Sequence, residues 1–313
     1  MRAKRKLQDQ VLVIAGASSG IGLATALMAV RRGARVVLSS FDAVQLEDAL
    51  RQVRAAGGTE RAHAVVADVT DASAVQRLAD EAVERFGRID TWVNNAGVHA
   101  FSYALELPEA DARRMMEVNL WGVVHGCRAA VPHLLASGGG VIVNVGSVLS
   151  SRAVPLQGMY GASKHAVKAY TEALRLELRA RHWPVSVTLV KPAAMHTPIV
   201  GNSKSLLPFR AQLPPFVYHP DVTARGILHC AERPPRDLIT GGIGVLAELG
   251  ETLAPRIADA IMRLTFFRLQ RAEGEPRKLS ALHAPGDTEA RVLSSDDRTV
   301  LRRSLWTAWR TAP

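Results

Sequence analysis

A tyrosine and a lysine four residues apart carry the clearest chemical signal in the sequence. Tyr160 and Lys164 lie in a segment with helical periodicity that continues past Ala173, so both side chains share one face of a helix. A phenol with a reference pKa of about 10 is a poor acid or base at neutral pH. Because a neighbouring ammonium group favours the phenolate, the pair predicts a tyrosine whose pKa is lowered for proton transfer.

A serine gives Tyr160 a second candidate partner. Ser147 follows the apolar run 141–146, where a strand is expected to end. At that point its hydroxyl can donate a hydrogen bond to a substrate oxygen while Tyr160 exchanges the proton. A tyrosine and a lysine at this spacing also occur as an exposed pair on a solvated helix, so the chemical interpretation depends on the remaining motifs.

Near the N-terminus, an apolar run passes into a glycine-rich turn and then into a helical segment. The glycines allow a tight turn and a close approach of the backbone, so that the helix can direct its N–H groups and positive dipole end at a pyrophosphate. The G-x-x-x-G-x-G spacing differs from the common G-x-G-x-x-G fingerprint, and a lone glycine-rich turn is also ordinary loop chemistry. The candidate nucleotide contacts in this turn are Gly16, Ser18, Ser19, Gly20, Ile21 and Gly22.

Two further polar segments follow strand-like runs. Asp68 and Val69 come after the third run, where a side chain can reach an adenine. Asn95, Ala96 and Gly97 come after the fourth run. Because open α/β sheets bind ligands at the carboxyl ends of their strands, these residues are additional candidates for nucleotide contact.

These candidate residues are positioned by an alternation of short β-rich runs and amphipathic helical segments. Each run is apolar on both sides, which predicts an α/β fold with a doubly wound parallel sheet covered by helices on both faces. The alternation stops near residue 242. We expect a flexible basic N-terminus over 1–7, a nucleotide-binding and catalytic domain over 8–242, and a helical C-terminal extension over 243–313. The expected strands are 11–14, 36–38, 64–66, 91–93, 141–143, 185–190 and 237–240.

The motifs and their order resemble the short-chain dehydrogenase/reductase family, in its branch with a single Rossmann domain. The resemblance covers residues 8–242 and includes the glycine-rich turn, the Asn-Asn-Ala-Gly segment at 94–97 and the Tyr-x-x-x-Lys pair. It implies reversible hydride transfer between NAD(P)(H) and a small ketone/alcohol pair. A protein of the same fold that binds the nucleotide without turnover, as a scaffold or regulator, is the alternative.

The resemblance also implies a role for each matching residue. Tyr160 would be the acid/base and Ser147 would orient the substrate. Lys164 would bind the nicotinamide ribose and, together with the charge of the oxidised nicotinamide, lower the pKa of Tyr160. Asn119 would hold a water in the proton relay. Pro192 and Thr197, after the sixth strand, would contact the nicotinamide.

Three positions depart from the pattern of the family. Ala15 replaces a threonine that ties the glycine-rich turn to a neighbouring strand, and Ala193 replaces a glycine near the nicotinamide. After the second strand, Ser40 and Phe41 stand where an aspartate selects NAD or an arginine selects NADP. Without an acid to repel a 2′-phosphate, Ser40 favours NADP(H) over NAD(H), although no arginine supplies a clamp.

The residues after the sixth strand indicate the kind of substrate. The segment 198–220 is apolar and proline-rich and occupies the variable lid position of the family, so we expect an apolar carbonyl or alcohol. The same side chains also fit simple packing onto the domain. Candidate pocket walls elsewhere, chosen by position, are His99, Phe101, Leu149, Met159 and His196.

The C-terminal extension carries an apolar stripe at helical spacing. Such a stripe usually docks onto protein, including a second copy in a homo-oligomer, and this interpretation is favoured over an interfacial membrane helix. Residues 272–294 are polar and are expected to be flexible, before a helix that opens at Ser295 and Asp296 and ends near Trp309. The stripe consists of Leu246, Leu249, Leu253, Ile257, Ile261 and Leu264.

Composition excludes several other classes of function. The net charge is +10, but the one tight basic cluster is Arg2, Lys4, Arg5 and Lys6, so we expect no nucleic-acid partner. Histidines show no metal-ligand spacing, and no metal is expected. The only cysteines, Cys127 and Cys230, fall in apolar segments as buried thiols, which fits a reducing cytoplasm, and no apolar run is long enough to span a membrane.

Overall fold

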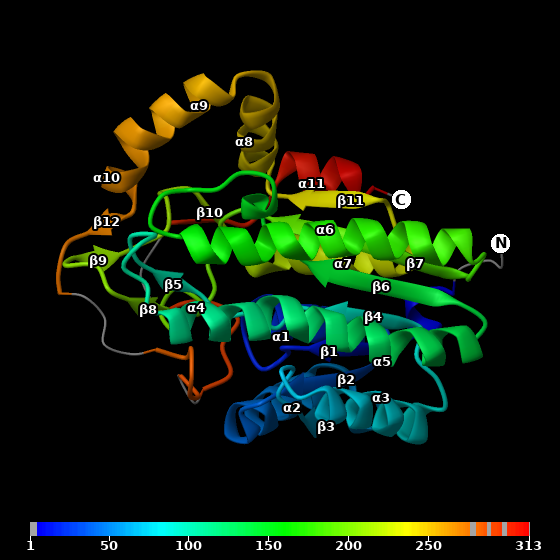
Figure 1. Ribbon diagram of the computed structural model, residues 1–313. Helices are drawn as coiled ribbons and strands as arrows, with labels where there is room; N and C mark the ends of the chain where they lie inside the picture. Colours follow the sequence, from blue (N-terminus) through cyan, green and yellow to red (C-terminus); the bar gives the residue numbers. More distant parts are fainter. Residues whose placement is uncertain (1–4, 276–279, 287–288, 296–298, 313) are drawn as a thin grey trace.

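Seven parallel strands form the central sheet of the protein (Figure 1). The computed structural model describes residues 5–275, 280–286, 289–295 and 299–312. The strands pair in the order β11-β7-β6-β4-β1-β2-β3, so the chain builds the sheet outward in both directions from β1. The expected doubly wound parallel sheet is therefore confirmed. The strands are β1 Val11–Ala15, β2 Arg35–Ser40, β3 Ala62–Val66, β4 Thr91–Asn94, β6 Gly140–Val145, β7 Val185–Pro192 and β11 Asp237–Thr240.

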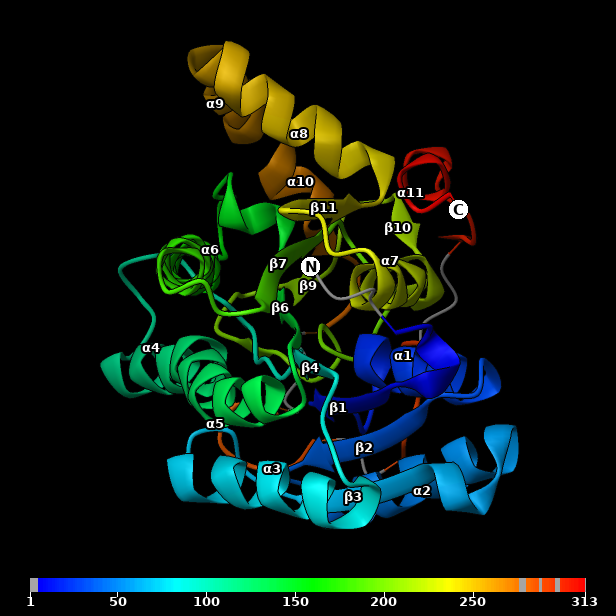
Figure 2. The ribbon, with the colours of Figure 1, turned by 90° about the vertical axis from the view of Figure 1, so that its right-hand side faces the viewer.

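Helices cover both faces of the sheet (Figure 2). Helices α3, α4, α5 and α6 lie on one face, and α1, α2 and α7 lie on the other. Aspartates cap two of them, because the Asp42 carboxylate accepts from two amides of α2 and Asp71 accepts from the Ser73 amide of α3. The helices are α1 Gly20–Arg31, α2 Ala43–Gly57, α3 Ala72–Phe86, α4 Glu109–Met116, α5 Gly122–Ala136, α6 Gly158–Ala180 and α7 Pro220–Glu232.

Strand β1 is apolar throughout because both of its faces are buried. In β1, Leu12 and Ile14 pack into the core on one side of the sheet, whereas Val13 and Ala15 pack into the core on the other side. Successive side chains of a strand point to opposite faces, so a polar residue in either series would lie in a core. The sequence therefore fixes this strand as a central one.

The C-terminal extension forms an arch that stands out from the body of the protein (Figure 1). After β11 the chain continues through α8 Gly242–Leu253, α9 Pro255–Ile261, a π-helical turn Met262–Phe266 and α10 Phe267–Leu269. It then returns to the body through short strands. Two small pairings result: β9 Arg210–Ala211 with β12 Arg271–Ala272, and β10 Val217–Tyr218 with β13 Val300–Leu301. A third pairing, β5 Ala100–Phe101 with β8 Lys204–Ser205, joins the loop after β4 to the segment after β7.

One expectation for the extension, the start of its last helix, is wrong. The last helix, α11 Leu305–Arg310, begins after Ser304, whose hydroxyl accepts from the Thr307 amide, and Val300–Leu301 before it is extended. Ser295 therefore does not open this helix, and Asp296 lies outside the described residues. The polar segment expected to be flexible packs onto the body in its described parts, since the Ala290 amide donates to Asp48 and Leu282 is buried. Residues 1–4 of the basic N-terminus also lie outside the described residues.

The apolar stripe of the extension does not pack onto its own domain. Leu246 is 69% exposed, Leu253 is 72% exposed and Ile257 is 64% exposed. The described part of the chain therefore leaves these side chains largely uncovered. In the described part of the chain, no helix is both long enough and apolar enough to cross a bilayer.

Gly126 on α5 allows this helix to lie directly against β4. A Cβ atom at position 126 would overlap with the Asn94 side-chain oxygen and lie 2.8 Å from Trp92 Nε1. Replacing Gly126 by alanine should lower the free energy of unfolding by about 2 kcal/mol, because the buried side chains around it cannot move without losing their hydrogen bonds. Urea denaturation measures the change.

Gly250 on α8 provides the matched control, since a Cβ atom there meets nothing within 4 Å. Alanine at position 250 should leave the free energy of unfolding unchanged or raise it by up to about 1 kcal/mol through helix propensity. Equal effects of the two substitutions would show that the close approach at Gly126 is not a constraint.

Candidate active site

A cavity of about 590 Å³ opens at the carboxyl ends of the central strands. Its walls come from the loops after β1, β2, β3, β4, β6 and β7, from the start of α6 and from the C-terminal extension. Parallel strands bring their carboxyl ends to one edge, which is why residues far apart in sequence meet here. All the nucleotide and catalytic candidates except Gly22 and Asn119 line the cavity.

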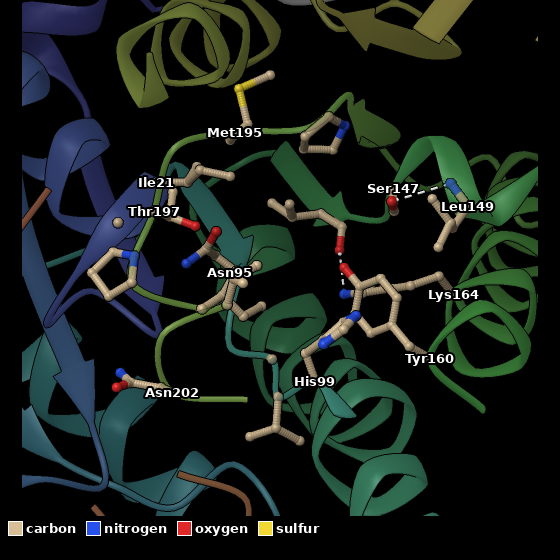
Figure 3. Close-up of a pocket in the computed structure, with 18 of the residues that line it drawn as sticks. Ile21, Asn95, His99, Ser147, Leu149, Tyr160, Lys164, Met195, Thr197 and Asn202 are labelled. Atoms are coloured by element: carbon tan, nitrogen blue, oxygen red, sulfur yellow. Dashed lines mark hydrogen bonds between the residues drawn. The ribbon is translucent and has the colours of Figure 1, made fainter. Parts of the chain in front are cut away.

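Tyr160, Lys164 and Ser147 face one another in this cavity (Figure 3). Tyr160 and Lys164 come from the first turns of α6, and the Lys164 Nζ atom lies 5.7 Å from the centroid of the Tyr160 ring. That ammonium group donates to the Val145 carbonyl oxygen over 3.1 Å. The helix therefore presents both side chains to the cavity, as the spacing of four residues predicts.

Burial governs the ionisation of this pair. It raises the pKa of Tyr160 to about 12, although a hydrogen bond with Ser147 offsets part of the effect. Burial also lowers the pKa of Lys164 to about 8. The protein's own groups therefore favour the neutral phenol. The lowering of the tyrosine pKa that we expect from Lys164 together with the charge of an oxidised nicotinamide is not produced by the protein's own groups alone, and it stays a prediction.

Ser147 is held at the end of β6 by a short helical turn. Its hydroxyl oxygen accepts from the Leu149 amide over 3.1 Å, and its own amide donates to Ser150 Oγ, also over 3.1 Å. These two bonds form a capping box that fixes the orientation of the serine. The Ser147 hydroxyl is thereby aimed at the phenol of Tyr160.

Asn119 lies behind the cavity, in the π-helical turn Glu117–Trp121. Its side-chain oxygen accepts from the Val98 amide, and its amide nitrogen donates to the Val98 carbonyl and to Ser163 Oγ. Asn119 therefore joins the loop after β4 to α6. Both amide protons of the Asn119 side chain are used within the protein. The side-chain amide therefore has no proton left to donate to a water, and the role of Asn119 as the holder of a water stays a prediction.

The glycine-rich turn lies in tight contact with the loop after β4. A Cβ atom on Gly16 would lie 2.5 Å from the Ala96 Cα atom, and the φ angle of Gly16 is +82°. The Asn95 side chain donates to the Gly16 carbonyl over 2.7 Å and fixes this approach. The loss of a threonine hydroxyl at Ala15 is compensated, because the Gly16 and Ala17 amides donate to the Ser39 carbonyl.

This turn fits the pyrophosphate of a dinucleotide. Gly22 tolerates no side chain, because a Cβ atom there would overlap with the Gly16 carbonyl oxygen. Ser19 caps α1 without a side-chain hydrogen bond, so the first amides of the helix are not satisfied by their cap, although the Gly20 amide donates to the Arg291 carbonyl of the extension. An anion is the natural partner for such a helix end.

Ser40 lines the cavity at the place where the protein would contact the adenosine ribose of a dinucleotide. Its hydroxyl accepts from Ser18 Oγ over 3.1 Å and from the Asp42 amide over 3.3 Å. Asp42 lines the same region of the cavity. Asp42 is not among the residues expected from the sequence, although it follows Ser40 by only two positions.

Asp68 and Thr197 mark two further edges of the cavity. Asp68 accepts from Arg114 of α4 over 3.1 Å, so a cation of a distant helix neutralises the carboxylate expected near the adenine. Thr197 packs against the glycine-rich turn, since a Cβ atom on Gly20 would lie 3.2 Å from it. Nothing in the sequence linked Arg114 to this region.

The substrate end of the cavity is mainly apolar. Of the candidate wall residues, His99 and Leu149 line it, whereas Phe101, Met159 and His196 are not among the described residues that do. The lid contributes Ile199, Leu213 and Phe216, but Leu207 and Phe209 instead pack onto Phe101. The extension adds Met262, Phe266 and Leu269, which the sequence analysis missed. In the described part of the chain, no cluster of metal-binding side chains was found.

Comparison with known proteins identifies the family. A family model described as short chain dehydrogenase matches residues 10–206. The uncharacterized oxidoreductase YxnA of Bacillus subtilis is 40% identical over 286 residues, which cover 90% of this chain and 80% of YxnA. A solved short chain dehydrogenase from Burkholderia cenocepacia in complex with NADP is 28% identical with a TM-score of 0.69, over 82% of this chain and 99% of that one.

A second solved structure extends the comparison to the other cofactor. NAD⁺-bound xylitol dehydrogenase is 33% identical with a TM-score of 0.58, over 61% of this chain and 72% of that one. The family match covers more than half of the chain, and the resemblance inferred from the motifs is confirmed. The chain therefore belongs to the short-chain dehydrogenase/reductase family of oxidoreductases.

Proposed function

We propose that the protein catalyses reversible hydride transfer between NAD(P)(H) and a small ketone/alcohol pair. The observation that carries this proposal is the meeting of Ser147, Tyr160 and Lys164 in the cavity that the glycine-rich turn also lines. A nucleotide-binding scaffold would need the turn but not the buried tyrosine and lysine. The complete set of reacting groups therefore favours turnover over the scaffold alternative.

The reaction assigns one task to each of the chain's own groups. The cofactor supplies or accepts the hydride when it is bound. In the direction of reduction, the Tyr160 hydroxyl donates its proton to the carbonyl oxygen, and the Ser147 hydroxyl holds that oxygen by a hydrogen bond. Lys164 offers its remaining protons to the ribose of the cofactor and stabilises the phenolate that Tyr160 becomes.

An apolar substrate follows from the walls of the cavity. Leu149, Leu213 and Phe216 line the same cavity as Tyr160, together with Met262 and Phe266 of the extension. Such walls bind a hydrocarbon group favourably, because its burial removes apolar surface from water. They offer a charged group few polar partners to replace the water that it would lose on binding. A screen of ketones and alcohols that follows cofactor absorbance would identify the substrate class.

Replacing Tyr160 by phenylalanine should lower the rate by a factor on the order of 10² to 10⁴, because the ring remains and only the transferred proton is lost. Steady-state kinetics with the best substrate of the screen gives the rate, and calorimetry gives the cofactor affinity, which should stay within about twofold of the wild type.

Tyr170→Phe removes a hydroxyl from the same helix outside the cavity and should leave the rate unchanged. Near-normal turnover in Tyr160→Phe would refute the assigned mechanism. Cofactor binding without oxidation or reduction across the whole screen would favour the scaffold instead.

For the cofactor, we propose a modest preference for NADP(H). Ser40 lacks the charge that would repel a 2′-phosphate, which supports this preference. The Asp42 carboxylate in the same wall acts against it, and this opposition is the reason for expecting only a modest preference. Similar proteins have been solved with each cofactor, NADP in one and NAD⁺ in the other.

Ser40→Asp should shift the ratio of the two dissociation constants toward NAD(H) by about tenfold, because the new carboxylate accepts from the ribose hydroxyls and repels the phosphate. Asp42→Asn keeps a capping side chain on α2 but removes its charge, so it should shift the ratio toward NADP(H). Fluorescence titration of both cofactors measures the ratios. A wild type that already prefers NAD(H), or an unmoved ratio in Ser40→Asp, would contradict the assignment.

For the extension, we propose contact with the surface of an anionic membrane. Of the acidic side chains of the arch, Glu248 pairs with Lys191, and Glu251 and Asp259 both pair with Arg152, although Asp259 itself is 72% exposed. The outward side chains are the apolar stripe and exposed arginines at positions 256, 263 and 268. An exposed apolar stripe accompanied by exposed cations is typical of segments that rest on anionic lipid.

The compartment and the assembly remain predictions. Both cysteines are free and buried, in keeping with the reducing cytoplasm that we expect. The alternative to a membrane is a second copy of the chain packed against the exposed stripe. Homo-oligomerisation, which we expect, would follow from that alternative. Light scattering of the wild type and the stripe variants distinguishes the two occupants.

Leu253→Asp should reduce co-sedimentation with vesicles of phosphatidylcholine and phosphatidylglycerol by about tenfold or more, because it places a charge in the apolar stripe. Leu305→Asp is the matched control, since Leu305 is 90% exposed on α11 outside the arch, and it should bind as the wild type does. Failure of the wild type to bind these vesicles, with a dimer that Leu253→Asp dissociates, would assign the stripe to a second copy.

A further inference from the structure

A line of buried polar side chains connects the C-terminal extension to Tyr160. Gln270 follows α10 and is fully buried, and its side-chain oxygen lies 2.5 Å from the Gln157 side-chain nitrogen. The Gln157 side-chain oxygen lies 2.7 Å from His99 Nε2. The His99 ring in turn packs edge-on against the ring of Tyr160, with 4.6 Å between the centroids.

The direction of each hydrogen bond in this line is set by backbone carbonyls. The Gln270 amide nitrogen donates to the Pro155 carbonyl over 3.0 Å and to the Phe266 carbonyl over 3.4 Å. Its oxygen therefore faces Gln157 and can only accept. Gln157 must then donate to Gln270, which leaves the Gln157 oxygen as an acceptor for a proton on His99 Nε2.

The other nitrogen of the imidazole has a partner of either kind. His99 Nδ1 lies 2.9 Å from Ser203 Oγ, whose single hydroxyl proton can go either to this nitrogen or to the Ile199 carbonyl oxygen 2.7 Å away. With the His99 proton on Nε2, Ser203 donates to Nδ1 and the Ile199 carbonyl loses that donor. A proton on Nδ1 alone would instead leave the Gln157 oxygen and the Nε2 lone pair facing each other over 2.7 Å, which is the more costly arrangement in a buried place, so the Nε2–H tautomer is favoured.

We propose that Gln270 is a positioning residue: through Gln157 it holds His99 as the neutral Nε2–H tautomer against the ring of Tyr160, so that the extension completes the active site. Both imidazole nitrogens are engaged, and His99 is accordingly a wall of the cavity and not a second acid or base. The kinetic consequence rests on the proposed dehydrogenase function, while the tautomer itself does not.

Electrostatics support a neutral imidazole at this place. Burial lowers the pKa of His99 to about 4, and the charge of Lys164 acts in the same direction. The ionisable side chains facing His99 are Lys164 and Tyr160. A charged imidazole would add a second cation beside Lys164, in a cavity that must also accept the positive charge of an oxidised nicotinamide.

Gln270→Met tests the proposal because methionine has a similar volume but neither donates nor accepts as an amide does. We expect kcat to fall about tenfold, which corresponds to the loss of a buried hydrogen bond. KM for the cofactor should stay within about twofold. Gln157→Met breaks the line without altering the extension and should have the same effect, which keeps the test decisive if Gln270→Met does not fold.

Gln212→Met provides the matched control. The Gln212 side chain donates to the carbonyls of Leu269 and Arg271, the two neighbours of Gln270, but it does not contact Gln157 or His99. It therefore anchors the same segment of chain without belonging to the line. We expect the kcat of Gln212→Met to stay within about twofold of the wild type. If kcat fell as far in Gln212→Met as in Gln270→Met, Gln270 would act only by packing the extension.

Nitrogen NMR of protein labelled with ¹⁵N-histidine reads the tautomer without any substrate. The His99 signal is identified by its absence in His99→Asn. We expect the Nε2–H form in the wild type and in Gln212→Met, and a mixture of tautomers in Gln270→Met. An unchanged tautomer in Gln270→Met would overturn the proposal, and this readout holds even if the protein turns over no ketone.

Discussion

Where Gly16 meets Ala96, two loops from neighbouring strands come so close that a side chain on the glycine would lie 2.5 Å from the opposing backbone. The Asn95 side chain fixes this contact by donating to the Gly16 carbonyl. Because β1 and β4 are adjacent parallel strands, the contact places the glycine-rich turn beside the loop that Asn119 ties to α6. The nucleotide end and the chemical end of the site are thereby held at a fixed separation.

Burial is the second constraint on the site. Tyr160 and Lys164 are both removed from water, which raises the pKa of the phenol and lowers that of the ammonium group. Each shift disfavours the charged form needed for proton exchange with an alcohol. In the proposed mechanism, the positive charge of an oxidised nicotinamide favours the phenolate of Tyr160, so that its ionisation depends on the state of the cofactor.

The C-terminal extension has two different faces. Met262, Phe266 and Leu269 line the cavity, whereas Leu253 and Ile257 are exposed on the outside. Further along, the Leu282 carbonyl accepts from Arg114, and the Arg291 carbonyl accepts from the Gly20 amide at the glycine-rich turn. The extension therefore touches both the substrate end and the nucleotide end of the site, although it lies beyond the part of the chain that the family model matches.

The sequence by itself determined the sheet, the glycine-rich turn and the Tyr160–Lys164 pair, because these depend on local periodicity and spacing. Ser147 and Asn95 were found in the same way, at the ends of recognisable strands. The tertiary structure alone decided which residues contact these groups. It places Arg114 beside Asp68, and it links Gln270 through Gln157 to His99. Such contacts join segments more than forty residues apart, and they depend on how the segments pack, which no local pattern records.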